Sequence, residues 1–591
     1  MPFLNKYPLN KRWSSFLTVS AVFLFFLLLL HPHPQPQPQP PDQCPLRPPS
    51  PPITGTNRGL GLGFSWRDIP QHNPVTNFAS LPTEKARLPR IQASFHSSRS
   101  SSKSKSEYES IRAARQSAIR DSFRRSWHAY ESLAWKADEL GPLSGKTKTT
   151  FGGWGATLVD NLDTLLIMDL PEEYERAVAA LLDIDFSPSS SQSSSQSSSI
   201  INMFETTIRY LGGFIAAYDL SGCRDTRLLT KAIQLGDMIY ASYDTKTRMP
   251  VTRWSPQKAA RGEEQFPATH GIIAELASSS LEMTRLSQLT GDMRYFDAIA
   301  RVTDTLDAQA AFTRIPGLWP VGVDVQTPDL TDDLTFSFGA MADSAFEYLG
   351  KTHQLLGGGQ QYKRLYENAM DAGARYLLFR PRVYDHADIL LPGTAHATSQ
   401  SSEIHLETRA EHLACFVGGM YALGGRLFSN ETHVELGKKL TDGCIWFYAN
   451  SPQGIMPEVF TVSSCPDFDE CSWDEQGQGV YDSIQDKHYL LRPEALESVF
   501  YLWRITGDEK YREAAWAMYE AIESATRTEY ANAAVKDVTV KRPSQIQNED
   551  SMESFWMAET LKYLYLIFSE PGHVSLDEFV FSTEAHPFRL Q

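Results

Sequence analysis

Apolar residues recur at helical spacing through most of the chain. Leu496, Val499, Phe500 and Trp503 stand at i, i+3, i+4 and i+7, which predicts a helix with one apolar face. The same pattern predicts helices over 269–288, 294–312, 340–357, 360–378, 411–428, 433–449, 493–505, 509–525 and 551–569. Strand signals are few and short. Helices joined by short connections favour an all-α toroid, although periodicity does not distinguish a closed barrel from an open solenoid.

The N-terminal segment has a different pattern. Residues 16–30 form an uncharged run rich in Leu and Phe, and counted from Trp13 the run has 18 residues, within the roughly 17–25 that span a bilayer. Three basic residues precede it and no small-residue cleavage site follows it. We therefore expect a cytosolic tail at 1–15, a transmembrane signal anchor at 16–30 and a lumenal remainder, which is single-pass type II topology.

Low-complexity composition marks two further segments. Residues 31–56 are rich in Pro and Gln, and 57–106 end in a Ser/Lys run, so we predict a disordered stalk over 31–106. Apolar and aromatic residues at helical spacing begin near residue 107, and we predict one folded domain over 107–591. The Ser/Gln-rich run 187–199 is expected to be a surface loop within it.

Composition excludes several classes of protein. A 42% apolar content rules out a wholly disordered chain, and a net charge of −16 with a pI near 5.5 argues against a nucleic-acid partner. The six cysteines are too few for a disulfide scaffold and show no zinc-site spacing.

Carboxylates recur in otherwise aromatic and apolar segments. Those that share a helix face, or lie among aromatic residues, are Glu205 with Arg209, Glu275 with Glu282, Asp343 with Glu347, Glu494 with Glu497, and Glu559. Glu553 is expected to point elsewhere. Each one alone is more often a surface salt-bridge residue. Together they suit a buried acid with a raised pKa beside an ionised base, which is the pair that cleaves a glycosidic bond.

Several motifs resemble a known family. They are FETTIRYLGG, TLVDNLDTL, the segment from Asp343 to Leu349, LRPEALES, MESFWMAETLKYLYLIFS and FSTEAHPF. Over roughly 108–591 they resemble glycoside hydrolase family 47, the class I α-1,2-mannosidases of the endoplasmic reticulum and Golgi. The resemblance implies an (αα)7 barrel with a small C-terminal β-hairpin plug, an inverting mechanism and a bound Ca²⁺.

The same resemblance implies a role for each matching residue. Glu205 matches the general acid, which is thought to act through a water, and Asp343 and Glu494 match the other two catalytic carboxylates, with Glu494 the favoured base. Thr583 matches a direct calcium ligand through its carbonyl and hydroxyl oxygens. Without the resemblance we would interpret Thr583 as a turn residue and His586 as a possible ligand. The positions that match the sugar site are Arg209, Glu282, Glu347, His412, Arg492, Glu497, Phe555, Glu559 and Glu584.

The resemblance also pairs Cys415 with Cys444 in a disulfide. Cys465 and Cys471 are close enough to bridge, and sequence leaves that open. Cys44 could link two chains, and Cys223 is expected to be free. Asn430 begins the N-glycosylation sequon Asn-Glu-Thr.

These features predict a membrane-bound enzyme of the endoplasmic reticulum or Golgi. It would remove terminal α-1,2-linked mannose from high-mannose N-glycans, from Man9 to Man5–8. Met341 stands where family members that remove a single mannose carry arginine, which favours removal of several. The alternatives are a degradation-enhancing mannosidase-like protein, which would lack the Cys415–Cys444 pair, and a catalytically inactive glycan-binding lectin, which would lack a catalytic carboxylate.

Overall fold

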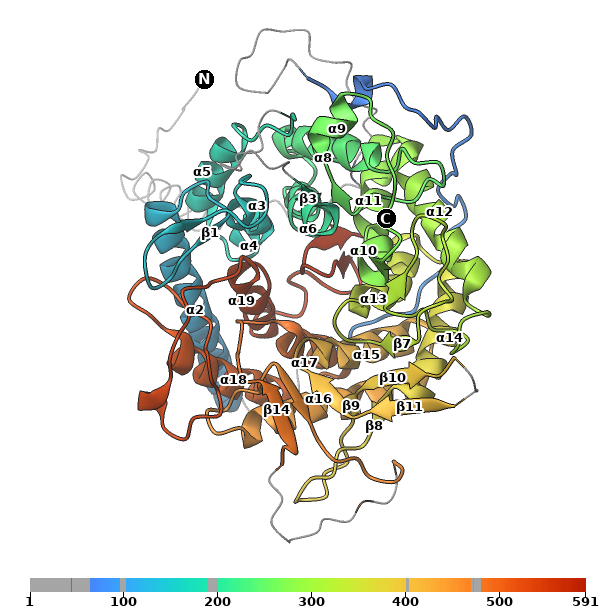
Figure 1. The fold of residues 1–591 in the computed structure, drawn as a ribbon. Coiled ribbons are helices and arrows are strands. Elements are labelled where there is room, and N and C mark those ends of the chain that lie inside the picture. The colour runs from blue at the N-terminus through green and yellow to red at the C-terminus, as the bar shows by residue number, and fades with distance from the viewer. Residues whose placement is uncertain are drawn as a thin grey trace, which may run out of the picture. The chain divides into compact units, whose positions relative to one another are not determined.

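The computed structural model describes residues 44, 64–95, 102–188, 200–399, 403–468, 471 and 480–591 (Figure 1). The chain divides into two units, Met1–Pro45 and Leu46–Gln591. The predicted tail, the anchor at 16–30, and 189–199 of the Ser/Gln-rich run lie outside the described residues. Within the described ranges, no helix combines the length and apolar character needed to cross a bilayer.

The second unit consists mainly of helices that pack in pairs: each pairs with the next long helix along the chain, except the last helix, which pairs with the first long one (Figure 1). The first members of the pairs are α4 (Leu162–Ile167), α7 (Gly212–Leu220), α11 (Ser280–Thr290), α13 (Asp343–Leu355), α15 (Val417–Leu427), α17 (Glu494–Thr506) and α19 (Leu561–Ile567). Their respective partners are α5 (Pro171–Leu181), α8 (Thr226–Ala241), α12 (Met293–Gln309), α14 (Gln360–Tyr376), α16 (Glu431–Asn450), α18 (Lys510–Thr526) and α2 (Ser102–Leu133).

Burial separates the two sets of helices. In α17 every residue from Ala495 to Ile505 is buried, and in α7 every residue from Gly212 to Asp219. The partner helices bury one face only, as amphipathic helices do. Each first-set helix contacts the next along the chain, from α4 to α19, and Lys562 of α19 forms an ion pair with Asp163 of α4 at 2.8 Å. The first-set helices therefore form the interior of the unit.

The pair α15–α16 packs backbone against backbone. A Cβ added to Gly418 would lie 2.4 Å from Thr441 Oγ1, and one added to Gly437 would lie 2.7 Å from the backbone nitrogen of Ala422. Glycine is needed at both positions because any side chain would separate the helices. The Cys415–Cys444 disulfide, with Cα atoms 6.0 Å apart, links α16 to the segment before α15.

The remaining helical elements are short. They are η1 (Trp66–Asp68), α3 (Ala156–Asp160), α6 (Met203–Glu205), η2 (Thr206–Leu211), α9 (Pro256–Ala260), α10 (Ile273–Ala277), η3 (Leu413–Phe416), η4 (Pro543–Gln545) and η5 (Trp556–Thr560). The predicted helix over 269–288 is two helices, α10 and α11, and the predicted helix over 551–569 begins only at η5. Both η2 and η5 are π-helical, which is common at functional sites.

The strands are short and pair antiparallel. The pairs and three-stranded sheets are β1 (Glu139–Leu140) with β2 (Thr147–Lys148); β3 (Ile201–Asn202) with β4 (Arg253–Trp254); β5 (Gly271–Ile272) with β6 (Gly322–Val323); β8 (Leu378–Phe379) with β9 (Leu391–Pro392); β11 (Ile404–Glu407), β10 (Thr394–Ala397) and β7 (Thr335–Ser337); β12 (Arg409–Glu411), β13 (Val459–Thr461) and β14 (Ser483–Asp486); and β15 (Phe579–Phe581) with β16 (Pro587–Arg589). The last pair is a C-terminal hairpin, and its turn carries Thr583.

Residues 64–95 lie against the helices, which corrects the predicted stalk over 31–106. Trp66 is buried and its indole Nε1 donates to the carbonyl oxygen of Phe186 at 2.8 Å. The backbone N–H of Ile91 donates to Asp577 Oδ1 at 2.6 Å, and that of Ala93 to the carbonyl oxygen of Arg504 at 2.8 Å. We call residues 64–95 the strap. Because these contacts attach it to the helices, the strap belongs to the helical unit, and the predicted boundary at 107 falls inside α2.

The remaining cysteines are also in disulfides. Cys465 and Cys471 are bridged, which decides the question left open by sequence. The expectation that Cys223 is free is wrong, because Cys223 is disulfide-bonded, as is Cys44. Sequence spacing cannot assign disulfide partners, and Cys223, buried just beyond α7, gave no other signal.

Candidate active site

The predicted catalytic carboxylates lie at the starts of first-set helices. Asp343 is the first residue of α13, Glu494 is the first residue of α17, and Glu205 ends the short helix α6, which continues into η2. The positive end of the helix dipole favours a negative charge at such positions. Asn202 caps α6, since its Oδ1 accepts from the backbone N–H of Phe204 at 3.1 Å.

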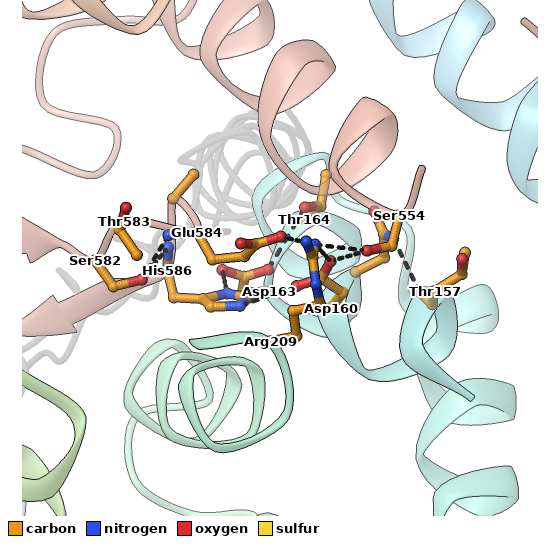
Figure 2. Close-up of polar contacts among 12 residues, drawn as sticks. Thr157, Asp160, Asp163, Thr164, Arg209, Ser554, Ser582, Thr583, Glu584 and His586 are labelled. Carbon is orange, nitrogen blue, oxygen red and sulfur yellow. Dashed lines mark hydrogen bonds and ion pairs between the residues drawn. The ribbon is translucent and has the colours of Figure 1, made fainter. Parts of the chain in front are cut away.

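Arg209 is the centre of one part of the site. Its Nε donates to Glu205 Oε2 at 2.8 Å, and its Nη1 contacts Glu584 and lies 3.1 Å from Ser554 Oγ and 3.5 Å from Asp160 Oδ2 (Figure 2). Burial alone would lower the pKa of Arg209, but the surrounding carboxylates raise it. The guanidinium is therefore a permanent positive charge that fixes two predicted site carboxylates, Glu205 and Glu584.

Two aromatic rings flank the same guanidinium. Its Cζ lies 4.5 Å from the ring centroid of Phe151 and 5.8 Å from that of Phe555. Both rings are half-buried. Phe555 was predicted from the resemblance, whereas Phe151 was not.

Asp343 and Glu494 differ in protonation although they are neighbours. Burial raises the pKa of Asp343 to about 7, and the charges of Glu347 and Glu494 add to the shift. Burial also acts to raise the pKa of Glu494, but His412 and Arg492 outweigh it and hold that pKa below its usual value. At neutral pH one carboxyl therefore keeps a proton for much of the time while the other is ionised, as acid–base catalysis requires.

His412 and Arg492 lie on either side of Glu494. His412 Nδ1 is 3.8 Å from Glu494 Oε2, and Arg492 Nη1 is 3.6 Å from Glu494 Oε1, so both are ion-pair distances rather than hydrogen bonds. Among the described residues, Glu494 Oε2 and His412 Nδ1 are buried without a hydrogen-bond partner. The other imidazole nitrogen of His412 is 2.7 Å from the Tyr448 hydroxyl. One oxygen of Glu494 is thus available to a further ligand.

Glu458 holds the segment that leads to Glu494, and sequence reasoning missed it. Its carboxylate accepts from the backbone N–H of Leu490 at 3.0 Å and from Arg492 Nε at 2.5 Å. Between them, buried Leu491 has a φ of 67°, a left-handed conformation that costs energy for a residue other than glycine. The two hydrogen bonds to Glu458 support this conformation and set the direction in which α17 begins. No spacing pattern relates Glu458 to the LRPEALES motif.

A second part of the site contains Glu282, Glu347 and Glu497, all buried. Lys351, one turn after Glu347 on α13, forms ion pairs with Glu347 and, at 3.6 Å, with Glu497 Oε1. The Tyr563 hydroxyl also donates to Glu497 Oε1 at 2.8 Å. Lys351 was not predicted, because a lone lysine in a helix is usually a surface residue.

Glu282 has no cationic partner among the described residues. Its Oε1 accepts from the Tyr348 hydroxyl at 2.8 Å and its Oε2 is buried without a hydrogen-bond partner. Burial raises its pKa to about 8. Burial likewise raises the pKa values of Glu559 and Glu584 well above the usual range. The charge of Glu584 adds to the shift of Glu559, and the charges of Asp160 and Glu205 add to that of Glu584. These three carboxyls therefore resist ionisation in the protein alone.

Thr583 is connected to Glu282 through Tyr348. Its backbone N–H donates to the Tyr348 hydroxyl at 3.2 Å, and Tyr348 in turn donates to Glu282. Calcium prefers oxygen ligands in an anionic surrounding. The half-buried Thr583, the free Glu282 Oε2 and the carboxyls with raised pKa values fit such an ion.

His586 does not offer a free nitrogen to a ligand. Its Nδ1 is 3.0 Å from Asp163 Oδ2 and its Nε2 is 3.2 Å from Asp160 Oδ1 (Figure 2). Its interpretation as a possible ligand therefore does not fit this arrangement.

Two acidic residues outside the predicted set face the same region. The charge of Glu553 raises the pKa values of Arg209 and Arg492, so this carboxylate lies near both cations. Burial, followed by the charge of Glu553, raises the pKa of Glu139 to about 8. Glu553 shares a segment with Ser554, which contacts Arg209.

Two predicted residues lie at the surface of the unit. Met341, two residues before Asp343, is 56% exposed and has a φ of 71°. Asn430 caps α16, since its Oδ1 accepts from the backbone N–H of His433 at 3.2 Å. Its glycosylation stays a prediction.

Known proteins are similar to this chain over most of its length. The sequence model of glycosyl hydrolase family 47 matches residues 122–590. The chain is 33% identical over 477 residues to mannosyl-oligosaccharide alpha-1,2-mannosidase IA of Spodoptera frugiperda, covering 79% of this chain and 65% of that protein. It is 33% identical over 489 residues to the human endoplasmic reticulum mannosyl-oligosaccharide 1,2-alpha-mannosidase, covering 80% of this chain and 64% of that protein. The matched part is thus slightly less than two thirds of each relative.

A solved structure extends the match to the fold. The alpha-1,2-mannosidase from Trichoderma reesei superimposes with a TM-score of 0.72 at 30% sequence identity, covering 81% of this chain and 99% of that one. The mostly helical architecture, the carboxylate-rich site and the family match over 122–590 lead to one conclusion: this chain belongs to glycosyl hydrolase family 47.

Proposed function

We propose that this protein hydrolyses terminal α-1,2-linked mannose residues of high-mannose N-glycans. The observation that carries the proposal is the pair Asp343 and Glu494, which begin helices α13 and α17 and whose pKa values move in opposite directions. The names of the related enzymes support the same substrate. We further propose that the seven helix pairs close into an (αα)7 barrel, with the β15–β16 hairpin as its plug.

In this mechanism Glu494 is the base. It is ionised at neutral pH, and its free Oε2 can accept a proton from a water that attacks the anomeric carbon. Direct attack by water inverts the configuration and requires the acid and the base to be roughly 6.5–9.5 Å apart. Arg492 and His412 hold Glu494 in place during the step.

The leaving oxygen needs a proton, for which there are two candidates. The resemblance gives this role to Glu205 through a water, but Glu205 is ion-paired with Arg209. Asp343, with a pKa of about 7, keeps a proton at neutral pH, so we assign the proton to Asp343 and the orientation of the leaving group to Glu205 with Arg209. Phe555 and Arg209 offer a sugar ring an apolar face and hydrogen-bond donors.

We propose that Thr583 holds a calcium ion through its carbonyl and hydroxyl oxygens, with Glu282, Glu559 and Glu584 around it. Such an ion would supply charge compensation for these carboxyls and oxygen coordination for sugar hydroxyls. Exposed Met341 offers no hydrogen-bond donor to select one glycan branch, which supports trimming of Man9 through to Man5–8. A type II anchor at 16–30 would place the site in the lumen of the endoplasmic reticulum or Golgi.

The test is incubation of the full-length chain in detergent with a Man9 glycan, with and without a calcium chelator. Release of mannose that stops on chelation supports the proposal, and NMR of the first product shows whether the anomer is inverted. Unchanged Man9 in the presence of calcium would contradict the function.

A substrate with a good leaving group distinguishes the catalytic acid from the catalytic base. α-Mannosyl fluoride needs no protonation, so Asp343→Asn should regain hydrolysis of the fluoride while Glu494→Gln should not. If Glu205→Gln regained hydrolysis of the fluoride and Asp343→Asn did not, Glu205 would be the acid.

A further inference from the structure

The turn between β15 and β16 carries two predicted site residues, Thr583 and Glu584, on a short loop. The loop has internal bonds: Ser582 Oγ accepts from the backbone N–H groups of Glu584 at 3.3 Å and His586 at 3.2 Å. Buried Ala585 has a φ of 57°, which is unfavourable for alanine. A loop with such a conformation needs outside contacts to hold it.

His586 supplies these contacts. Its two ring nitrogens lie 3.0 Å from Asp163 Oδ2 and 3.2 Å from Asp160 Oδ1, and all three side chains are fully buried (Figure 2). An imidazole that faces carboxylates on both sides donates from both nitrogens, which requires the protonated ring. Burial alone lowers the pKa of His586, but Asp163 and Asp160 raise it more.

Two neighbours complete the arrangement. Lys562 Nζ donates to Asp163 Oδ2 at 2.8 Å and to the carbonyl oxygen of Ala585 at 2.9 Å, so a second cation ties the same loop to the same aspartate. A Cβ added to Gly212 would lie 2.6 Å from His586 Cδ2, so α7 leaves room for the ring only because residue 212 is glycine.

The contacts connect the loop to a specific part of the fold. Asp160 ends α3 and Asp163 lies in α4, three residues apart and facing the same way (Figure 2). Both proposed calcium-binding oxygens belong to one residue, Thr583, so their positions depend on the backbone of the loop. Movement of the loop would displace both oxygens together.

We propose that His586 is a positioning residue that fixes the 582–586 loop through Asp160 and Asp163 and thereby sets the calcium affinity of Thr583. This inference rests on the proposed calcium site. It assigns no contact between His586 and the sugar or the ion.

The test measures calcium affinity rather than activity. The thermal midpoint of the full-length chain in detergent is recorded against free Ca²⁺ set by chelator buffers, which yields the calcium concentration of half-maximal stabilisation. His586→Gln can donate to only one aspartate, so it should need at least about tenfold more calcium. Gly212→Ala keeps every charge but displaces the ring, and should shift the calcium midpoint in the same direction.

Each variant has a matched control elsewhere in the fold. His433 is a buried histidine that lies 3.1 Å from Asp371, and Gly236 is a helical glycine whose Cβ would lie 2.3 Å from Leu286. His433→Gln and Gly236→Ala should lower the thermal midpoint without changing the calcium midpoint.

Unchanged calcium midpoints in His586→Gln and Gly212→Ala, or equal shifts in the controls, would overturn the positioning role. If His586→Gln does not fold, Gly212→Ala decides the question. A wild-type chain that calcium does not stabilise would refute the calcium site itself, and the Man9 assay reports separately on hydrolysis.

Discussion

The buried carboxyl of Glu282 should make the stability of the calcium-free protein fall as pH rises. Burial raises its pKa from 4.5 to about 8 in the folded protein, so between these values the native state keeps a proton that the unfolded chain has lost. Unfolding then releases a proton, and a higher pH favours the unfolded state. One such group lowers the free energy of unfolding by about 1.4 kcal/mol per pH unit within the window, and no further above it.

Glu282→Gln removes this proton without removing the acceptor for Tyr348, which donates to Glu282 Oε1 at 2.8 Å. The free energy of unfolding is measured with urea in excess chelator at several pH values between about 5 and 8. Plotted against pH, it should fall less steeply in Glu282→Gln than in the wild type, by about 1.4 kcal/mol per pH unit. Glu435→Gln, at a side chain that is 59% exposed, is the control and should leave the slope unchanged. Parallel curves for Glu282→Gln and the wild type would refute the reasoning. Saturating calcium should flatten the wild-type curve, because a cation favours the ionised carboxyl.

Three further predictions concern the catalytic acid, the strap and the substrate range. Asp343→Asn should lower kcat by about 10²- to 10⁴-fold. Wild-type activity should fall above pH 7 as Asp343 loses its proton. If activity of the variant fell above pH 7 in the same way, Asp343 would not be the acid. Trp66→Ala should lower the free energy of unfolding by about 3–5 kcal/mol, since the indole is buried and donates to Phe186; urea unfolding checks this, and an unchanged midpoint would mean that the strap does not stabilise the unit. Met341→Arg should slow the later cleavages of Man9 more than the first in a time course, and a wild-type enzyme that stops at a single Man8 isomer would contradict the interpretation of Met341.

Sequence periodicity predicted the helices well where one face is apolar, and failed where the chain is not periodic. The strap has no helical pattern, and only isolated residues such as Trp66 and Ile91 are buried in it. A Pro- and Ser-rich neighbourhood therefore concealed a segment that contacts α8, α12 and the C-terminal region. The break between α10 and α11 falls at Ser278 and Ser279, and it was missed because apolar residues recur on both sides of it.

The predicted site residues could be found because acidic residues in apolar segments are unusual, and because the motifs resemble a family. Their supporting residues could not. Glu458 and Lys351 act through tertiary contacts with segments distant in sequence or with a neighbouring helix, and a single glutamate or lysine has no pattern of its own.

The distribution of charge supports the proposed cation beside Thr583. Arg209 compensates Glu205 and Glu584, Lys351 compensates Glu347, and Arg492 lies beside Glu494. Next to Thr583, Glu282 has no cationic partner among the described residues, one of its buried oxygens has no hydrogen-bond partner, and burial raises its pKa to about 8. Burying a carboxylate without compensation costs several kcal/mol, so ionised Glu282 would be stabilised by a positive charge beside it. Tyr348 joins Glu282 to the backbone of Thr583, so the loop fixed by His586 stands where that charge is needed.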